Sequence, residues 1–225
     1  MNERLAGAIC LLATVVLYLA ARGLHLRRPC FWLAPVFLVP TVLIVSLVCL
    51  RVPFPVYNHY SHWLIWLLGP ATIAFANPIY AHRHLIRRYP ISILTGVLSS
   101  ICLGLASSWT LSRVFALSPD LTRGMLLRSI STPFAMQAPG AVGASPALAA
   151  LLVLLTGVCG ILIGDWILLW IAPRSRLARG AMWGAAAHAI GTAKAHQRHP
   201  EEGAVSSLVM IFAGVAMVML APWLG

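Results

Sequence analysis

The sequence is short of charge, and above all of acidic residues. Only 9% of its 225 residues are charged, and five acids stand against sixteen lysines and arginines. Soluble domains carry about a quarter charged residues. A chain that is 60% hydrophobic would also expose more apolar surface than water tolerates. These deficits exclude a soluble globular protein. They predict a single integral membrane domain over residues 1–225, with an all-α, polytopic transmembrane fold.

Motifs of catalysis and metal binding are also missing. The five cysteines form no CxxC pair and have no close histidine, which favours small buried thiols over a disulfide or a metal site. No Ser/His/Asp order, Gly-rich phosphate loop or metal-ligand spacing occurs. The basic residues form no stripe on a polar domain. We therefore expect no enzymatic activity, no cofactor, no metal and no nucleic-acid partner.

Long apolar segments are what the chain has in quantity. A helical span of the bilayer needs about 20 apolar residues, and the sequence suggests about six to eight membrane segments. They are expected at residues 5–21, 31–50, 64–80, 91–117, 147–171, 181–195 and 205–224. Proline and glycine interrupt several of them. The small-residue segment 181–195 either crosses the membrane or re-enters it, and the sequence leaves both readings open.

Arginines gather in three short clusters between the apolar segments. The clusters lie at 22–28, 83–88 and 174–179. Because cytoplasmic loops carry an excess of Lys and Arg, we expect all three on the cytoplasmic side and the N-terminus outside. Arg123 and Arg128 fall on the opposite side, so the rule is followed imperfectly.

Two proline-preceded helix starts are candidate anion sites. Thr132 before Pro133 and Asn77 before Pro78 offer a capping residue followed by a proline suited to the first helical turn. The free N–H groups and partial positive charge of such an end attract anions. The segments around them echo each other weakly, which suggests an internal inverted repeat with a substrate site at its interface. The alternative is that each proline only kinks a packing helix.

A polar stripe follows in the small-residue segment. On a helix, His188 and Thr192 share one face, while Gly191 keeps a neighbouring face thin enough for close packing. Polar residues inside membranes are usually functional, so we expect these three, with Ser206 and Ser207 on the last segment, to bind substrate. The alternative is a histidine satisfied by a carbonyl of a neighbouring helix.

Other polar residues have less specific roles. His196 and His199 stand beside Arg198 and Pro200, which predicts an interfacial loop. Asp165 is the only acid within an expected span. It is a candidate for ion or proton coupling, although a histidine partner or a position at a helix end would explain it equally well.

Taken together, four stretches resemble the LrgB/CidB family of holin-like and antiholin-like bacterial inner-membrane proteins. They are LGPATIAFANPIYAHRHLIRRYPISILTGVLSS, SISTPFAM, LTGVCGILIG and ARGAMWGAAAHAIGTAKAHQRHPEEGAVSSLVM. The C-terminal part of the plastid glycolate/glycerate translocator is similar. Departures from the family pattern at Asn77, Ser131 and Asp165 leave the substrate and any coupling ion open.

The resemblance implies two competing functions in a multi-pass protein of the bacterial inner membrane. One is transport of a small carboxylate such as glycolate, glycerate or pyruvate. The other is control of murein hydrolase export and autolysis together with a small LrgA/CidA-type membrane partner. A homo-oligomer is compatible with either. The two capped helix starts and the His/Thr pair favour carboxylate transport.

Overall fold

The computed structural model describes residues 3–28 and 30–224, and these form helices joined by short turns, with no strand among them. The all-α expectation is confirmed. The chain divides into two compact units, Met1–Pro70 and Ala71–Gly225. The candidate functional residues all lie in the second unit.

The first unit is built on one long helix. Its elements are α1 (Glu3–Arg27), the 3₁₀ turn η1 (Phe31–Leu33), α2 (Pro35–Cys49), α3 (Phe54–Ser61) and α4 (Trp63–Trp66). Helix α1 packs against α2 and α3. Gly7 allows this close approach, because a Cβ there would lie 3.1 Å from the carbonyl oxygen of Val56.

The second unit contains the longest helices. Helix α5 (Leu68–Ala74) runs across the boundary between the two units. The elements that follow are α6 (Ala76–Ala81), α7 (Arg83–Arg88), α8 (Pro90–Val114), α9 (Pro119–Leu126), α10 (Thr132–Ala135), α11 (Pro139–Val142), α12 (Pro146–Ile171), α13 (Arg176–Arg198), α14 (Pro200–Leu220) and the 3₁₀ turn η2 (Ala221–Trp223).

Proline sets where many of these helices begin. Helices α8, α9, α12 and α14 each start on a proline, whose fixed φ and missing N–H suit the first helical position. Ser118 adds a side-chain cap to α9 by accepting from the N–H of Leu121. Local sequence therefore determines where these helices of the second unit begin.

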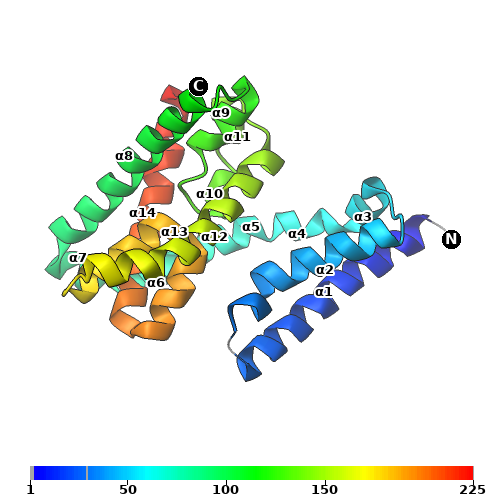
Figure 1. The fold of residues 1–225 in the computed structure, drawn as a ribbon, viewed down its shortest axis with the longest axis horizontal. Coiled ribbons are helices and arrows are strands. Elements are labelled where there is room, and N and C mark those ends of the chain that lie inside the picture. Colours follow the sequence, from blue (N-terminus) through cyan, green and yellow to red (C-terminus); the bar gives the residue numbers. More distant parts are fainter. Residues whose placement is uncertain (1–2, 29, 225) are drawn as a thin grey trace. The chain divides into compact units, whose positions relative to one another are not determined.

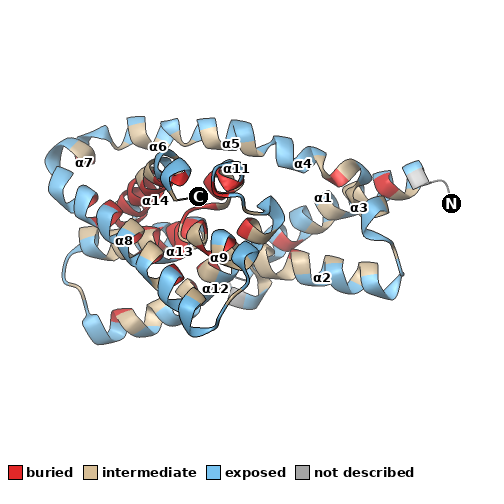
Figure 2. Cartoon of the chain, turned by 90° about the horizontal axis from the view of Figure 1, so that it is seen from above, coloured by how far each residue is buried: buried red, intermediate tan, exposed pale blue. Residues whose placement is uncertain are grey.

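Helix α14 lies at the centre of the second unit. Of its most apolar stretch, 67% is buried, against 39% for α8 and 22% for α12. Figure 1 shows α14, in red, beside α8, in green, and the two helices are in contact. Figure 2 shows buried residues concentrated along α14. A helix that is apolar and covered on most sides belongs to the interior of a bundle.

Five helices among the described residues are long and apolar enough to cross a membrane. They are Arg4–Arg27, Phe54–Ala81, Pro90–Val114, Pro146–Ile171 and Pro200–Trp223, and Pro35–Cys49 is a shorter apolar helix. The second of these joins α3 to α6 in one nearly continuous run. The polytopic character is thus confirmed, while the internal repeat stays a prediction.

Candidate functional site

Helix α13 folds back on itself in the middle. His188 has φ 48° and ψ −130°, which is outside helical geometry and separates residues 176–187 from 189–198. In a straight helix, Trp183 and Arg198 would lie about 22 Å apart along the axis. Instead the guanidinium carbon of Arg198 lies 6.0 Å from the centroid of the Trp183 ring, and the Lys194 ammonium lies 5.1 Å from it. Residues 176–198 therefore form a helical hairpin with His188 at its tip.

Glycines allow the hairpin to close and to pack against α14. A Cβ at Gly191 would lie 2.5 Å from the carbonyl oxygen of Trp183, on the opposite arm. A Cβ at Gly184 would collide with the carbonyl oxygen of Ser206 on α14. Small residues at helix contacts let backbones approach closely. Gly191, which the sequence predicts to bind substrate, thus lies where the two arms of the hairpin touch.

The hairpin tip meets an unwound segment between α9 and α10. His188 is buried, and its ring Nε2 lies 3.2 Å from the backbone carbonyl oxygen of Arg128, so that the N–H tautomer donates to this oxygen. The non-helical residues that surround Arg128 are largely covered; Leu127 and Ile130, for example, are buried. The strained tip is thereby joined to the backbone that carries Arg128.

The other predicted polar residues are also buried and bonded within the protein. The hydroxyls of Thr192 and Ser206 lie 2.8 Å apart, and the Thr192 hydroxyl also lies 3.9 Å from the sulfur of Met210. Ser207 donates to the carbonyl of Gly203, one turn earlier in α14. The two contacts of Thr192 join the second arm of the hairpin to α14, whereas the bond of Ser207 stays within α14.

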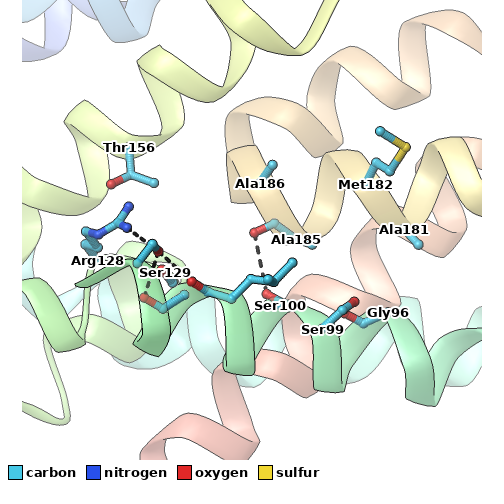
Figure 3. Close-up of a pocket in the computed structure, with 13 residues that line it drawn as sticks. Gly96, Ser99, Ser100, Arg128, Ser129, Thr156, Ala181, Met182, Ala185 and Ala186 are labelled. Atoms are coloured by element: carbon cyan, nitrogen blue, oxygen red, sulfur yellow. Dashed lines mark hydrogen bonds between the residues drawn. The ribbon is translucent and has the colours of Figure 1, made fainter. Parts of the chain in front are cut away.

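A cavity of about 420 Å³ opens beside the hairpin, between α8, α12 and the first arm of α13. Its polar lining comprises Ser99, Ser100, Ser107, Arg128, Ser129 and Thr156. Figure 3 shows Ser99 and Ser100 on α8, Thr156 on α12, and Arg128 and Ser129 on the unwound segment, with the small residues of α13 opposite α8. Cavities of about 300–1,000 Å³ are typical of small-ligand sites.

Arg128 is anchored in this cavity by hydroxyls. Its Nε donates to Ser108 at 3.1 Å, and one terminal nitrogen donates to Ser107 at 2.7 Å. Ser108 in turn donates to the carbonyl of Met125 at 2.7 Å. A guanidinium has five N–H donors, so about three remain for a ligand. Their planar arrangement matches the two oxygens of a carboxylate.

Arg128 has no acidic partner among the side chains that the structure describes. The four acids described there each pair with a different base: Asp120 with Arg123, Glu201 with Arg176, Glu202 with Arg179, and Asp165 with Lys194 and Arg198. A partly buried cation without a counter-ion is costly in an apolar surrounding. An anionic ligand would supply the missing charge.

The cavity hydroxyls can also serve as acceptors. Ser99 donates to the carbonyl of Thr95 at 2.7 Å, and Thr156 donates to that of Leu152 at 2.8 Å. A hydroxyl that donates once still has lone pairs free. The lining can therefore accept a hydrogen bond from a hydroxyl group on the ligand.

The two proline-preceded helix starts lie in the same region but outside this cavity. Phe75, just before α6, stacks on Phe134 of α10 with ring centroids 5.5 Å apart. Thr132 and Pro133 are partly buried at the start of α10, where Ser131 occupies the capping position with its buried hydroxyl unpaired. Pro78 is partly buried. Asn77 is exposed and lies inside α6, whose cap position is Phe75.

Asp165 lies at the open end of the hairpin. It pairs with Lys194 and, at 3.8 Å, with Arg198. Its side chain is 48% exposed. The ion-pair explanation of this residue therefore has direct structural support, with lysine and arginine as partners in place of histidine.

The sequence reasoning missed Arg128 and the serines of α8. In the sequence, Arg128 is indicated only as a loop charge on the less basic side. The stretch SSICLGLASS, residues 99–108, carries two Ser-Ser pairs inside an apolar span. The sequence does carry a signal for this site. Hydroxyls repeat within an apolar span, and an arginine without a nearby acid follows them.

The fold and this cavity define a class of protein: a polytopic α-helical membrane protein with a helical hairpin beside an arginine-containing cavity. The model of the LrgB-like family matches residues 14–225, and the chain belongs to this family. It is 33% identical to YxaC of Bacillus subtilis (strain 168) over 99% of this chain and 96% of YxaC. It is 30% identical to the holin-like protein CidB of Staphylococcus epidermidis (strain ATCC 12228 / FDA PCI 1200) over 99% of this chain and 97% of CidB. No solved structure matches the chain.

Proposed function

We propose that this protein is a carrier of small monocarboxylates such as glycolate, glycerate or pyruvate, located in the bacterial inner membrane. The observation that carries the proposal is Arg128, a partly buried guanidinium that faces a cavity and lacks an acidic partner among the described side chains. In this proposal it binds the carboxylate, and the surrounding serines accept from the hydroxyl of a hydroxy acid.

The helical hairpin supports this proposal by placing small residues against the cavity. Ala181, Ala185 and Ala186 line it from the first arm of α13. Ser100 of α8 donates to the carbonyl of Ala185 at 3.5 Å, a long and weak bond. The contact of this wall with α8 can therefore loosen without breaking a strong bond, while the ion pairs of Arg176 and Arg179 keep the same arm on α14. Such movement is what alternating access to one site requires.

Uptake of labelled pyruvate, glycolate and glycerate into proteoliposomes tests the proposal. Arg128→Gln removes the charge and keeps a polar side chain. Losing a hydrogen bond to a charged group costs about 1.5–3 kcal/mol, so the apparent affinity should fall about ten- to hundredfold. Arg123→Gln is the matched control, because Arg123 is half-exposed and pairs with Asp120. Absence of uptake of all three acids by the unaltered protein would refute the carrier function for them.

A second candidate function comes from the relatives. Several of them carry the name holin-like protein CidB. A protein that controls murein hydrolase export and autolysis would act through assembly, as a homo-oligomer or with a small LrgA/CidA-type partner. Its activity would depend on lipid-facing helix surfaces and would tolerate Arg128→Gln. Lysis assays on cells that express this variant separate the two functions.

A further inference from the structure

A second cavity of about 380 Å³ runs along α12 next to the first one. Its lining is mainly apolar and includes Leu152, Leu155, Cys159, Ile163 and Ile167. Leu155 and Ile163 are about half exposed, at 49% and 50%, so the groove opens on the outer face of this helix. A groove with these walls can accept hydrocarbon and offers little to a polar group.

The two cavities meet at the anion-binding arginine. Arg128, Thr156 and Ala186 line both of them. Figure 3 shows Arg128 and Thr156 close together at one end of the first cavity. The guanidinium therefore lies at a junction, with hydroxyls on one side and an apolar groove on the other.

The chemistry of the junction suits one kind of molecule. A carboxylate bound to Arg128 would have its remaining atoms directed either toward the serines of α8 or along α12. A three-carbon acid is too short to extend far into the groove, which spans about four turns of α12 from Leu152 to Ile167. An aliphatic chain attached to the carboxylate would fill it.

We propose that the anion site of Arg128 continues into the groove along α12, and that monocarboxylates with an aliphatic tail of several carbons bind at this site more tightly than two- and three-carbon acids. This inference rests on the proposed carrier function. The carboxylate binds the guanidinium, and the tail lies on Leu155, Cys159 and Ile163. Each methylene that enters the groove leaves water, which is worth about fourfold in affinity.

Competition against uptake of labelled pyruvate tests the inference. Acetate, butyrate and hexanoate are compared as inhibitors in proteoliposomes. The expected result is an inhibition constant that falls about fourfold for each added methylene. Equal inhibition by the three acids would overturn the inference. It would leave the carrier function intact, because pyruvate uptake itself is measured in the same experiment.

A pair of cysteine variants separates binding in the groove from dissolution of the longer acids in lipid. Cys159→Phe fills the groove, and the residue is exposed, so the added ring does not enter the packed interior. Cys102→Phe is the matched control, since Cys102 is an exposed cysteine on α8 that lines neither cavity.

The ratio of the inhibition constants of acetate and hexanoate is measured within each variant, so that a general loss of protein cancels. It should collapse toward one in Cys159→Phe and stay at the value of the unaltered protein in Cys102→Phe. A ratio that both variants keep would show that the tail lies elsewhere, and would overturn the inference.

Discussion

Replacing His188 by glycine and, separately, by alanine tests whether the chain reverses at this residue. Both changes remove the imidazole and its hydrogen bond to the carbonyl of Arg128. The stability lost with that bond is the same in the two variants and cancels when they are compared. What remains is the difference between the two residues in the backbone conformation at the hairpin tip.

The sign of that difference depends on the fold. Inside a continuous helix, alanine is more stable than glycine by about 1 kcal/mol. At φ 48° and ψ −130°, a residue with a Cβ stores about 1–3 kcal/mol of strain that glycine avoids. Glycine loses about 0.5–1 kcal/mol more through its freedom in the unfolded chain. The glycine variant should therefore be the more stable one, by about 0–2.5 kcal/mol.

Thermal unfolding of the purified protein in detergent measures this difference. One kcal/mol corresponds to about 2–4 °C in the midpoint for a chain of this size. Ala193→Gly is the control, because Ala193 is exposed within the second arm of α13, and the change should lower the midpoint by the ordinary helix cost of about 1 kcal/mol. If alanine at 188 were more stable than glycine by a similar amount, the hairpin would be refuted.

Three further changes test the packing around the hairpin. Gly184→Ala places a methyl group against the carbonyl of Ser206 and should lower the free energy of unfolding by about 1–3 kcal/mol, measured as a lower unfolding midpoint. An unchanged midpoint would contradict the close contact of α13 and α14. Thr192→Val keeps the side-chain volume but leaves the Ser206 hydroxyl without its partner, which should lower the free energy of unfolding by about 1–3 kcal/mol. Thr192→Ser keeps the hydroxyl and should retain most of the stability. Asp165→Asn should cost less than about 1 kcal/mol, because the pair with Lys194 is partly exposed, and it should leave uptake intact; loss of uptake with an unchanged midpoint would point to a coupling role.

The membrane fold was predictable because its signals are local. Apolar length identifies α8, α12 and α14, and a proline marks the start of each helix. These features need no knowledge of the partners against which the helices pack. The same holds for the family resemblance, which depends on short motifs.

The site was only partly predictable because its residues come together through tertiary contacts. Arg128 meets Ser107 from a separate helix 21 residues earlier, and no periodicity encodes that contact. The reversal at His188 was hidden for a different reason. The tip carries neither glycine nor proline, and the spacing of His188 and Thr192 fits a continuous helix. Alanine and glycine around the tip supplied the close packing but gave no sign of the turn itself.

In the proposed carrier, Arg128 is the anion-binding group. Isothermal titration of purified protein with pyruvate tests this most directly, because it measures binding without relying on transport. This role of Arg128 predicts saturable binding by the unaltered protein, a loss of about ten- to hundredfold in affinity for Arg128→Gln, and unchanged binding for Arg123→Gln. Equal affinities for the two variants and the unaltered protein would contradict it.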